Sequence, residues 1–325
     1  ESIRYEFEQA FKRHYLETEG RTVEFDWRNP GGTSDIVRYV DDRFAGNFRR
    51  FWEKDPSLGP WSKTVADNFS NSKMDSPPEG ADPLAVKARK TFLSSDVGVD
   101  IDIFFGGGQY DISKQAQKGQ AVDAGLLKSH PDWFTQGVIP QKFSGEIFYD
   151  PQGRYYGSCL SSFGIRYNVD AVKLLGVQPP RRWSDLGEKE YFGTLAVADP
   201  TKSGSINKCF EMIIQQQMAD AVRHAGKKTP EALDKGWLNA MALVRRIGAN
   251  SRCVTDSASK VVRDVSKGDS AAGICIDFYG RTESEWAQEY GGRIRMEYVA
   301  PVGGTSISAD PIMLFRGAPN RRTAV

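Results

Sequence analysis

Small hydroxyl and glycine residues recur where a predicted strand runs into a predicted helix. The clearest stretch is Ala196–Ser205, in which a short apolar strand ends at Asp-Pro and a helix with apolar residues at helical spacing begins near Ile206. Ser203, Gly204 and Ser205 then lie at the N-terminus of that helix. Free backbone N–H groups and the positive end of the helix dipole favour an anion there. The alternative is that a serine hydroxyl serves only as the helix N-cap.

Other predicted strands end in the same way. In open α/β sheets, ligands bind beyond the carboxyl ends of the strands, so these residues are expected to line one cleft. The polar or glycine residues that follow the other predicted strands are Thr33, Ser34, Gly107, Gly108, Ser257, Asp277 and Tyr279.

Two long segments, 157–168 and 306–315, are predicted as strands that cross between two lobes. The first carries Ser161 and Ser162 at its centre, and the second carries Asp310. We expect the three side chains to face the ligand. The alternatives are a serine ladder within the sheet and an ordinary turn aspartate before a proline.

The elements that must position these residues alternate between strands and helices. A chain of 325 residues is too long for one small core and suits two lobes of the α/β type. We expect each lobe to be a mixed sheet flanked by helices. The approximate lobes are residues 1–120 plus 303–325, with a surface insertion near 56–83, and residues 121–302. The predicted strands are 22–27, 99–105, 157–168, 194–198, 250–254, 271–276, 294–300 and 306–315, and the main predicted helices are 2–17, 33–51, 83–94, 169–175, 206–221, 229–247, 259–267 and 282–290.

Composition excludes several classes of protein. The net charge of +1 argues against a general nucleic-acid surface, and no apolar run approaches the length of a membrane span. The chain opens directly on a helix and ends at the apparent start of another. The absence of a signal peptide from it is therefore uninformative. A monomer is expected.

No catalytic or cofactor motif is recognisable. Gly106-Gly107-Gly108 follows a strand but lacks the spacing of a dinucleotide fingerprint, and GxSxG, HExxH and P-loop motifs are absent from the sequence. The histidines, His14, His130 and His224, are predicted on helix or turn surfaces. We therefore expect a binding protein with no cofactor rather than an enzyme.

The order of several loose motifs resembles a known family. The segments that carry the resemblance are Asp102–Gly107, Tyr156–Asn168, Ala198–Ser205, Gly268–Gly273 and Arg316–Asn320. Together they resemble the type II periplasmic solute-binding proteins of ABC importers (family 1-like), in the branch that binds ferric iron, sugar phosphates or phosphonates. The resemblance implies a two-lobed fold with hinge strands and high-affinity capture of a solute between the lobes. It also implies a periplasmic or other extracytoplasmic location and delivery of the solute to a membrane permease. A receptor role in chemosensing would use the same closed form.

The hydroxyl-rich junctions favour an oxygen-rich anion such as a sugar phosphate or a phosphonate, with Asp277 accepting hydrogen bonds from ligand hydroxyls. The alternative is a ferric or other metal ion. The iron binders of this family typically use paired tyrosines after the strand that corresponds to 271–276, where this chain offers only Tyr279. A metal would therefore be held by Asp277, Tyr279 and Asp310.

The four cysteines, Cys159, Cys209, Cys253 and Cys275, have no CxxC spacing, so a zinc site is not expected. They are either reduced core thiols or two disulfides. The export compartment implied by the resemblance favours disulfides, as the pairs Cys209–Cys253 and Cys159–Cys275.

Overall fold

The computed structural model describes residues 2–143 and 145–325. The chain divides into two compact units, Glu1–Gly31 and Gly32–Val325. Among the described residues of both units, no helix has the length and apolar character of a membrane-spanning segment.

The first unit contains α1 (Ser2–Glu19) and an extended segment after it. The prediction of a strand at 22–27 is wrong, because residues 21–30 form no helix or strand. Phe25 instead packs its ring against the aromatic face of α1, 5.6 Å from Phe11 and 6.5 Å from Phe7 between ring centroids. The apolar residues of segment 22–27 that predicted a strand therefore include one that packs against a helix.

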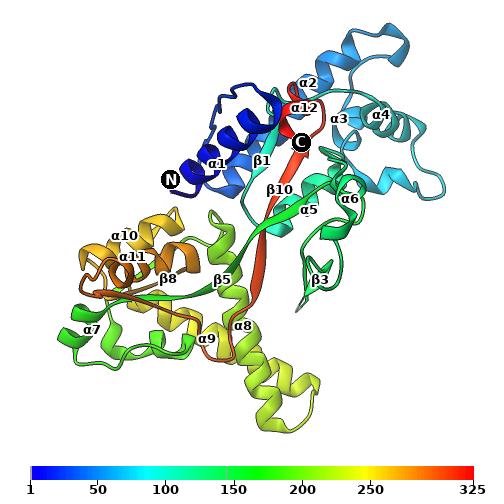
Figure 1. Cartoon of the computed structure of the whole chain (residues 1–325). Coiled ribbons are helices and arrows are strands. Elements are labelled where there is room, and N and C mark those ends of the chain that lie inside the picture. Colours follow the sequence, from blue (N-terminus) through cyan, green and yellow to red (C-terminus); the bar gives the residue numbers. More distant parts are fainter. Residues whose placement is uncertain (1, 144) are drawn as a thin grey trace. The chain divides into compact units, whose positions relative to one another are not determined.

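The second unit contains the remaining elements (Figure 1). The helices are α2 (Thr33–Glu53), α3 (Lys63–Asn68), α4 (Pro83–Ser94), α5 (Gln109–Lys118), α6 (Leu126–Ser129), α7 (Val169–Leu175), α8 (Gly204–Ala225), α9 (Pro230–Asn250), α10 (Ala258–Lys267), α11 (Asp277–Glu289) and α12 (Arg321–Ala324). The strands are β1 (Ile103–Phe105), β2 (Ala121–Val122), β3 (Lys142–Phe143), β4 (Glu146–Ile147), β5 (Tyr156–Asn168), β6 (Leu195–Ala198), β7 (Ser251–Thr255), β8 (Ala272–Ile276), β9 (Met296–Val299) and β10 (Ile307–Phe315). Short 3₁₀ helices are η1 (Pro56–Leu58), η2 (Ser72–Asp75), η3 (Pro131–Trp133), η4 (Trp183–Gly187) and η5 (Lys189–Tyr191).

The long strand β5 changes partners halfway along its length. Its first half pairs antiparallel with β10, and from Phe163 onward it pairs with β8 and β9 (Figure 1). The sheet runs in the order β1-β10-β5-β8-β6-β7, with β6 parallel to β7 and β8. The two predicted crossing strands are therefore confirmed as neighbours in one mixed sheet.

Two separate hydrophobic cores lie on either side of this change of partners. Core A includes Val40, Phe44, Phe48, Trp52, Val65, Phe69, Phe92, Phe104 and Phe315. Core B includes Phe163, Ile165, Trp183, Leu195, Ile206, Ile213, Leu243, Val261, Ile274 and Ile276. In the part of the sheet that crosses core B, α8 and α9 cover one face, and α10 and α11 cover the other (Figure 1). This is the α/β architecture that the sequence predicts.

Three local predictions need correction. The segment 56–83 is not simply a surface insertion, because α3 and the residue after it bury Val65 and Phe69 in core A. The strand predicted at 99–105 is reduced to the three residues of β1. The helix predicted from Thr282 begins five residues earlier, at Asp277, so Asp277 and Tyr279 lie in its first turn rather than in a loop.

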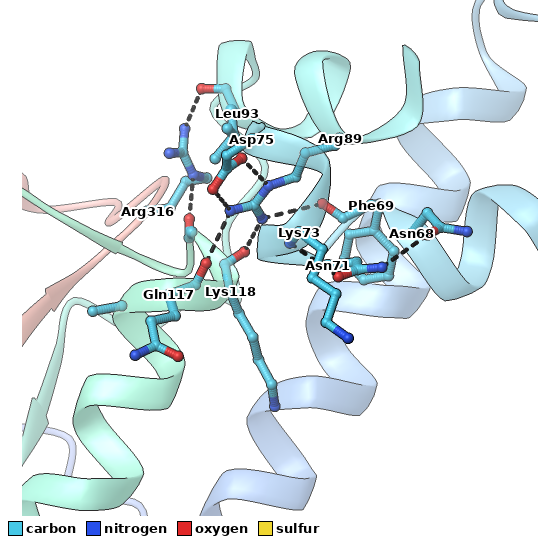
Figure 2. Close-up of polar contacts among 12 residues, drawn as sticks. Asn68, Phe69, Asn71, Lys73, Asp75, Arg89, Leu93, Gln117, Lys118 and Arg316 are labelled. Atoms are coloured by element: carbon cyan, nitrogen blue, oxygen red, sulfur yellow. Dashed lines mark hydrogen bonds and ion pairs between the residues drawn. The ribbon is translucent and has the colours of Figure 1, made fainter. Parts of the chain in front are cut away.

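Buried arginines fasten α5 to the rest of core A (Figure 2). Arg89 of α4 is 2% exposed and donates to both carboxylate oxygens of Asp75, at 2.7 and 3.0 Å. It also donates to the carbonyl oxygens of Phe69 and of Gln117 and Lys118 at the end of α5. Gly119 ends α5 in the left-handed conformation, and the Arg89 network connects this end of the helix to η2 and to the residue after α3.

All four cysteines are free thiols in the structure, so neither predicted disulfide is present in it. Cys209 lies on α8, and its Sγ is 4.0 Å from the carbonyl oxygen of Cys275. Cys253 faces the other side of the sheet, where its Sγ lies 3.2 Å from the carboxylate of Asp264 on α10. Cys159 is exposed on β5, whereas Cys275 is buried on β8. The sheet itself lies between Cys209 and Cys253, the partners of the first predicted disulfide.

Candidate ligand-binding site

The first turns of α2, α5 and α8 meet at one point. A β-carbon placed on Gly204 would lie 3.6 Å from Asp111 Oδ2, 3.9 Å from the backbone nitrogen of Gly108 and 4.0 Å from Thr33 Oγ1. A β-carbon on Gly107 would lie 3.1 Å from the methyl group of Thr33. We call these five residues the helix-start cluster. It brings together four of the residues that the sequence placed at strand ends.

The loop before α8 packs closely against the start of α2. Gly32 is the N-cap residue of α2, and a β-carbon there would lie only 2.4 Å from the carbonyl oxygen of Lys202. Ser34 Oγ donates to the carbonyl oxygen of Thr201 at 3.2 Å. Only glycine leaves room for this approach, which holds helices from the two cores side by side.

The two serines of the stretch Ala196–Ser205 occupy different positions at the start of α8. Ser203 is the N-cap of α8, and its Oγ accepts a hydrogen bond from the backbone N–H of Ile206 at 3.4 Å, so its hydroxyl does serve as a cap. Gly204 and Ser205 occupy the first two positions of the helix. Backbone N–H groups at such positions have no partner within the helix and can donate to an oxyanion.

Asp111 lies in the cluster, and the sequence analysis missed it as a site residue. It is the third residue of α5, and burial raises the pKa of its carboxyl group, an effect that Lys114 and Lys118 oppose. A carboxylate among helix N-termini accepts hydrogen bonds, whereas the surrounding N–H groups donate them. The cluster therefore suits a ligand group that offers both oxyanion oxygens and a hydroxyl. The triple glycine immediately before this helix was the available signal.

A second group of predicted residues gathers where β5 changes partners. Ser162 Oγ donates to Asp277 Oδ2 at 3.0 Å and lies 3.2 Å from Tyr298 Oη. Asp310 of β10 lies opposite Cys159 of β5, with 3.9 Å between Oδ2 and Sγ. We call these five residues the hinge cluster.

The carboxyl group of Asp310 is strongly perturbed. Burial raises its pKa to about 7, and the negative charge of Asp277 contributes in the same direction. A carboxylate accepts hydrogen bonds from ligand hydroxyls, and a carboxyl group with a raised pKa, such as that of Asp310, can also donate one. The sequence predicts Ser162, Asp277 and Asp310 as site residues but not Tyr298, because nothing in the sequence around Tyr298 marks it as a site residue.

The remaining predicted residues lie outside both clusters. Ser161 is buried and donates to the carbonyl oxygen of Ser308 at 3.3 Å, which is the serine-ladder alternative. Tyr279 is 37% exposed and packs its ring against Phe278. Ser257 precedes α10 and contacts Ser259 at 3.0 Å.

A polar cavity of about 390 Å³ opens between the loops that follow β6 and β7, and its lining residues are Asp199, Lys202, Val254, Thr255, Asp256 and Lys260. A larger cavity of about 550 Å³, between Pro77 and Thr91, contains none of the predicted site residues. Among residues 2–143 and 145–325, no group of three or more His, Cys, Asp or Glu side chains is placed to hold a metal ion.

Comparison with known families gives one match over most of the chain. The family model described as bacterial extracellular solute-binding protein matches residues 101–322. Among curated proteins, the phosphoglycerate transport regulatory protein PgtC of Salmonella typhimurium (strain LT2) is 26% identical over 120 residues. That stretch spans 37% of this chain and 26% of the length of PgtC.

Solved structures agree at the level of the fold. The periplasmic binding protein P5PA aligns with a TM-score of 0.54 and 16% identity, covering 97% of this chain and 73% of P5PA. AfuA from Actinobacillus pleuropneumoniae, a periplasmic binding protein solved with fructose 6-phosphate bound, aligns with a TM-score of 0.52 and 17% identity. That alignment covers 81% of this chain and 74% of AfuA.

Proposed function

This chain belongs to the bacterial extracellular solute-binding proteins, the type II binding proteins of ABC importers, and we propose that it captures a small oxygen-rich anion. The ligand class is a sugar phosphate, a phosphonate or a similar compound. The site would lie between the lobes proposed from the sequence, with the helix-start cluster and the hinge cluster contributing to it.

The observation that carries this proposal is the meeting of three helix N-termini in the helix-start cluster. Each first turn contributes backbone N–H groups that have no intrahelical partner, and the helix dipoles add positive potential at the same point. An oxyanion can accept from several of these donors at once, which a bare cation cannot do. These donors at three helix N-termini therefore favour a phosphate-like group.

The hinge cluster would bind the remainder of the ligand. Asp277 and Asp310 provide acceptors, so they suit hydroxyl groups on a sugar or polyol. The structure of AfuA with fructose 6-phosphate bound and the name of PgtC, which refers to phosphoglycerate transport, support a ligand that combines phosphate and hydroxyl groups.

The family supports a biological role in solute transport. The protein would work in the periplasm or another extracytoplasmic compartment, bind its solute as a monomer and deliver it to the membrane permease of an ABC importer. Contact of the ligand with both cores would shift the population toward a closed form, because only that form makes both sets of contacts. The closed form is what a permease would distinguish from the empty protein.

A thermal-shift panel tests the ligand class. The panel contains sugar phosphates including fructose 6-phosphate, phosphonates, uncharged polyols and Fe³⁺. A phosphate- or phosphonate-bearing compound should raise the melting temperature increasingly as its concentration exceeds Kd. Stabilisation by Fe³⁺ alone, or by uncharged polyols alone, would contradict the proposal.

A charge variant tests the site itself. A β-carbon on Gly204 makes only ordinary contacts, so Gly204→Asp should fold, but its carboxylate would repel the anion. We expect affinity for the stabilising compound to fall about 30-fold or more, as for two like charges a few ångströms apart in a partly buried site. The matched control is Ala219→Asp, which adds the same charge at an exposed position of α8 and should leave affinity unchanged.

A further inference from the structure

The ring of Tyr298 fits into a space left by two glycines. A β-carbon on Gly164 of β5 would lie 2.6 Å from Tyr298 Oη, and a β-carbon on Gly280 of α11 would lie 2.4 Å from Cδ2 of the ring. Contacts this short do not occur, so Gly280 is required for the ring to lie where it does, whereas a β-carbon on Gly164 would also lie 2.2 Å from the carbonyl oxygen of Val299. Tyr298 is thereby held between β5 and the first turns of α11.

From this position the phenol starts a chain of two hydrogen bonds. Tyr298 Oη lies 3.2 Å from Ser162 Oγ, which lies 3.0 Å from Asp277 Oδ2. In its ionised form the Asp277 carboxylate can only accept, so the single hydroxyl hydrogen of Ser162 is used toward Asp277. Tyr298 must then be the donor to Ser162, and the chain runs in one direction from the phenol to the carboxylate.

The chemistry of the phenol keeps that direction fixed. Burial raises the pKa of Tyr298, so the phenol retains its proton across the physiological range. The other oxygen of Asp277, Oδ1, accepts from the backbone N–H of Phe278 at 2.8 Å. Both carboxylate oxygens are therefore held, and each keeps a lone pair for a further donor.

The backbone beneath Asp277 is fixed as well. Arg166, which is fully buried, donates to the carbonyl oxygens of Tyr279 and Gly280 at 3.1 Å each. The first turn of α11 therefore cannot easily rotate to compensate for a change at Ser162. The orientation of the Asp277 side chain is then set by the hydrogen bonds from Ser162 and from the backbone N–H of Phe278.

We propose that Tyr298 is a positioning residue for ligand binding, which acts through Ser162 to hold the Asp277 carboxylate where it accepts a ligand hydroxyl. The inference rests on the proposed function. It adds a residue that does not itself touch the ligand, and it gives a reason for the glycine at position 280 of α11.

The first test is a crystal structure of the ligand-free Tyr298→Phe protein. The phenylalanine ring still fits the space left by the glycines, so the fold should be retained. Without the hydrogen bond from Tyr298, the Ser162 hydroxyl is free to rotate, so its own hydrogen bond to Asp277 weakens and the Asp277 carboxylate should occupy a second orientation. An Asp277 carboxylate that stays in its wild-type place would overturn the inference, whatever the ligand is.

The second test is a double-mutant cycle with fructose 6-phosphate as the probe in titration calorimetry. Tyr298→Phe should weaken binding about fivefold, the loss of one hydrogen bond, with little change in melting temperature. In an Asp277→Asn background, the same substitution should have no further effect. Equal effects in both backgrounds would mean that Tyr298 acts independently of Asp277, which contradicts the proposal.

Tyr167→Phe is the matched control. Tyr167 is also a buried tyrosine whose phenol donates to a carboxylate, that of Glu297, but it has no connection to Asp277. The Tyr167→Phe substitution should leave affinity for fructose 6-phosphate unchanged. If Asp277→Asn leaves affinity unchanged while Gly204→Asp abolishes it, this inference fails and the proposed anion site stands. If fructose 6-phosphate does not bind the wild-type protein, the proposed ligand class is weakened and the crystal structure of Tyr298→Phe decides the inference.

Discussion

At the scale of single residues, Asp310 is the side chain whose protonation should be most visible. It lies on β10 opposite Cys159, partly buried, with the charge of Asp277 nearby. Its ordinary pKa is near 3.8, and burial raises the pKa in the folded protein to about 7. The folded state therefore holds this proton more tightly than the unfolded state does.

Asp310→Asn should remove this source of pH dependence. Because the folded pKa is raised, the stabilising contribution of Asp310 is complete below the unfolded pKa and is lost as the pH rises through 7. Between pH 5 and pH 8, wild-type stability should fall relative to the variant by about 2 kcal/mol. Urea unfolding at both pH values measures the difference. Parallel pH profiles for the two proteins would show that Asp310 is not perturbed.

The same scale shows what local sequence could and could not predict at the candidate site. Ser162, Asp277 and Gly204 were predicted because they follow or interrupt strands in a recognisable pattern. Tyr298 and Asp111 were not, because their roles arise from neighbours more than 100 residues away or on other helices. The ligand-binding roles of all the predicted site residues, inside the two clusters and outside them, stay predictions.

At the scale of elements, Arg89 joins four parts of core A. Its guanidinium group is shared among α4, η2, the residue after α3 and the end of α5 (Figure 2). Arg316 makes a similar connection, donating to the carbonyl oxygens of Leu93, Ser95 and Gly119. The position of α5, and so of its first turn in the helix-start cluster, depends on these buried donors.

Arg89→Met should therefore destabilise the protein strongly. It leaves the carbonyl oxygens of Phe69, Gln117 and Lys118 without this donor, and we expect a loss of about 3–5 kcal/mol in the free energy of unfolding. Lys90→Met, at the exposed neighbouring position of α4, should change it by less than about 0.5 kcal/mol. Chemical denaturation at 25 °C compares the two. Similar values would mean that the arginine network adds no stability.

Elements were predicted well where the local pattern and the tertiary contacts agree. Helices α4 and α7 have the bounds that the sequence indicates, and β5 and β10 differ from prediction by one residue. The start of α11 was missed because Gly280 resembles a helix stop. The structure requires glycine there for the ring of Tyr298, so a tertiary contact overrides the local preference.

At the scale of the whole molecule, several connections join the elements around core A to those around core B. The crossing strands β5 and β10 connect them covalently, and the start of α2 contacts the loop before α8. An ion pair adds to these, because Lys208 of α8 lies 2.7 Å from Glu146 of β4. Although burial opposes the charge of Lys208, its carboxylate partners hold its pKa above the ordinary value.

If ligand binding brings the two cores together, this ion pair should strengthen binding without touching the ligand. Glu146→Gln should weaken affinity for fructose 6-phosphate about threefold, the value of a partly exposed ion pair, mainly through faster dissociation. Glu211→Gln removes the other partner of Lys208, which lies on the same helix at 3.2 Å, and should leave affinity unchanged.

The difference in affinity between the two variants should shrink in 1 M salt, where screening reaches partly exposed charges. Equal dissociation rates for the two variants in stopped-flow experiments would indicate that the pair exists independently of closure, since a contact present in both open and closed forms cannot favour either.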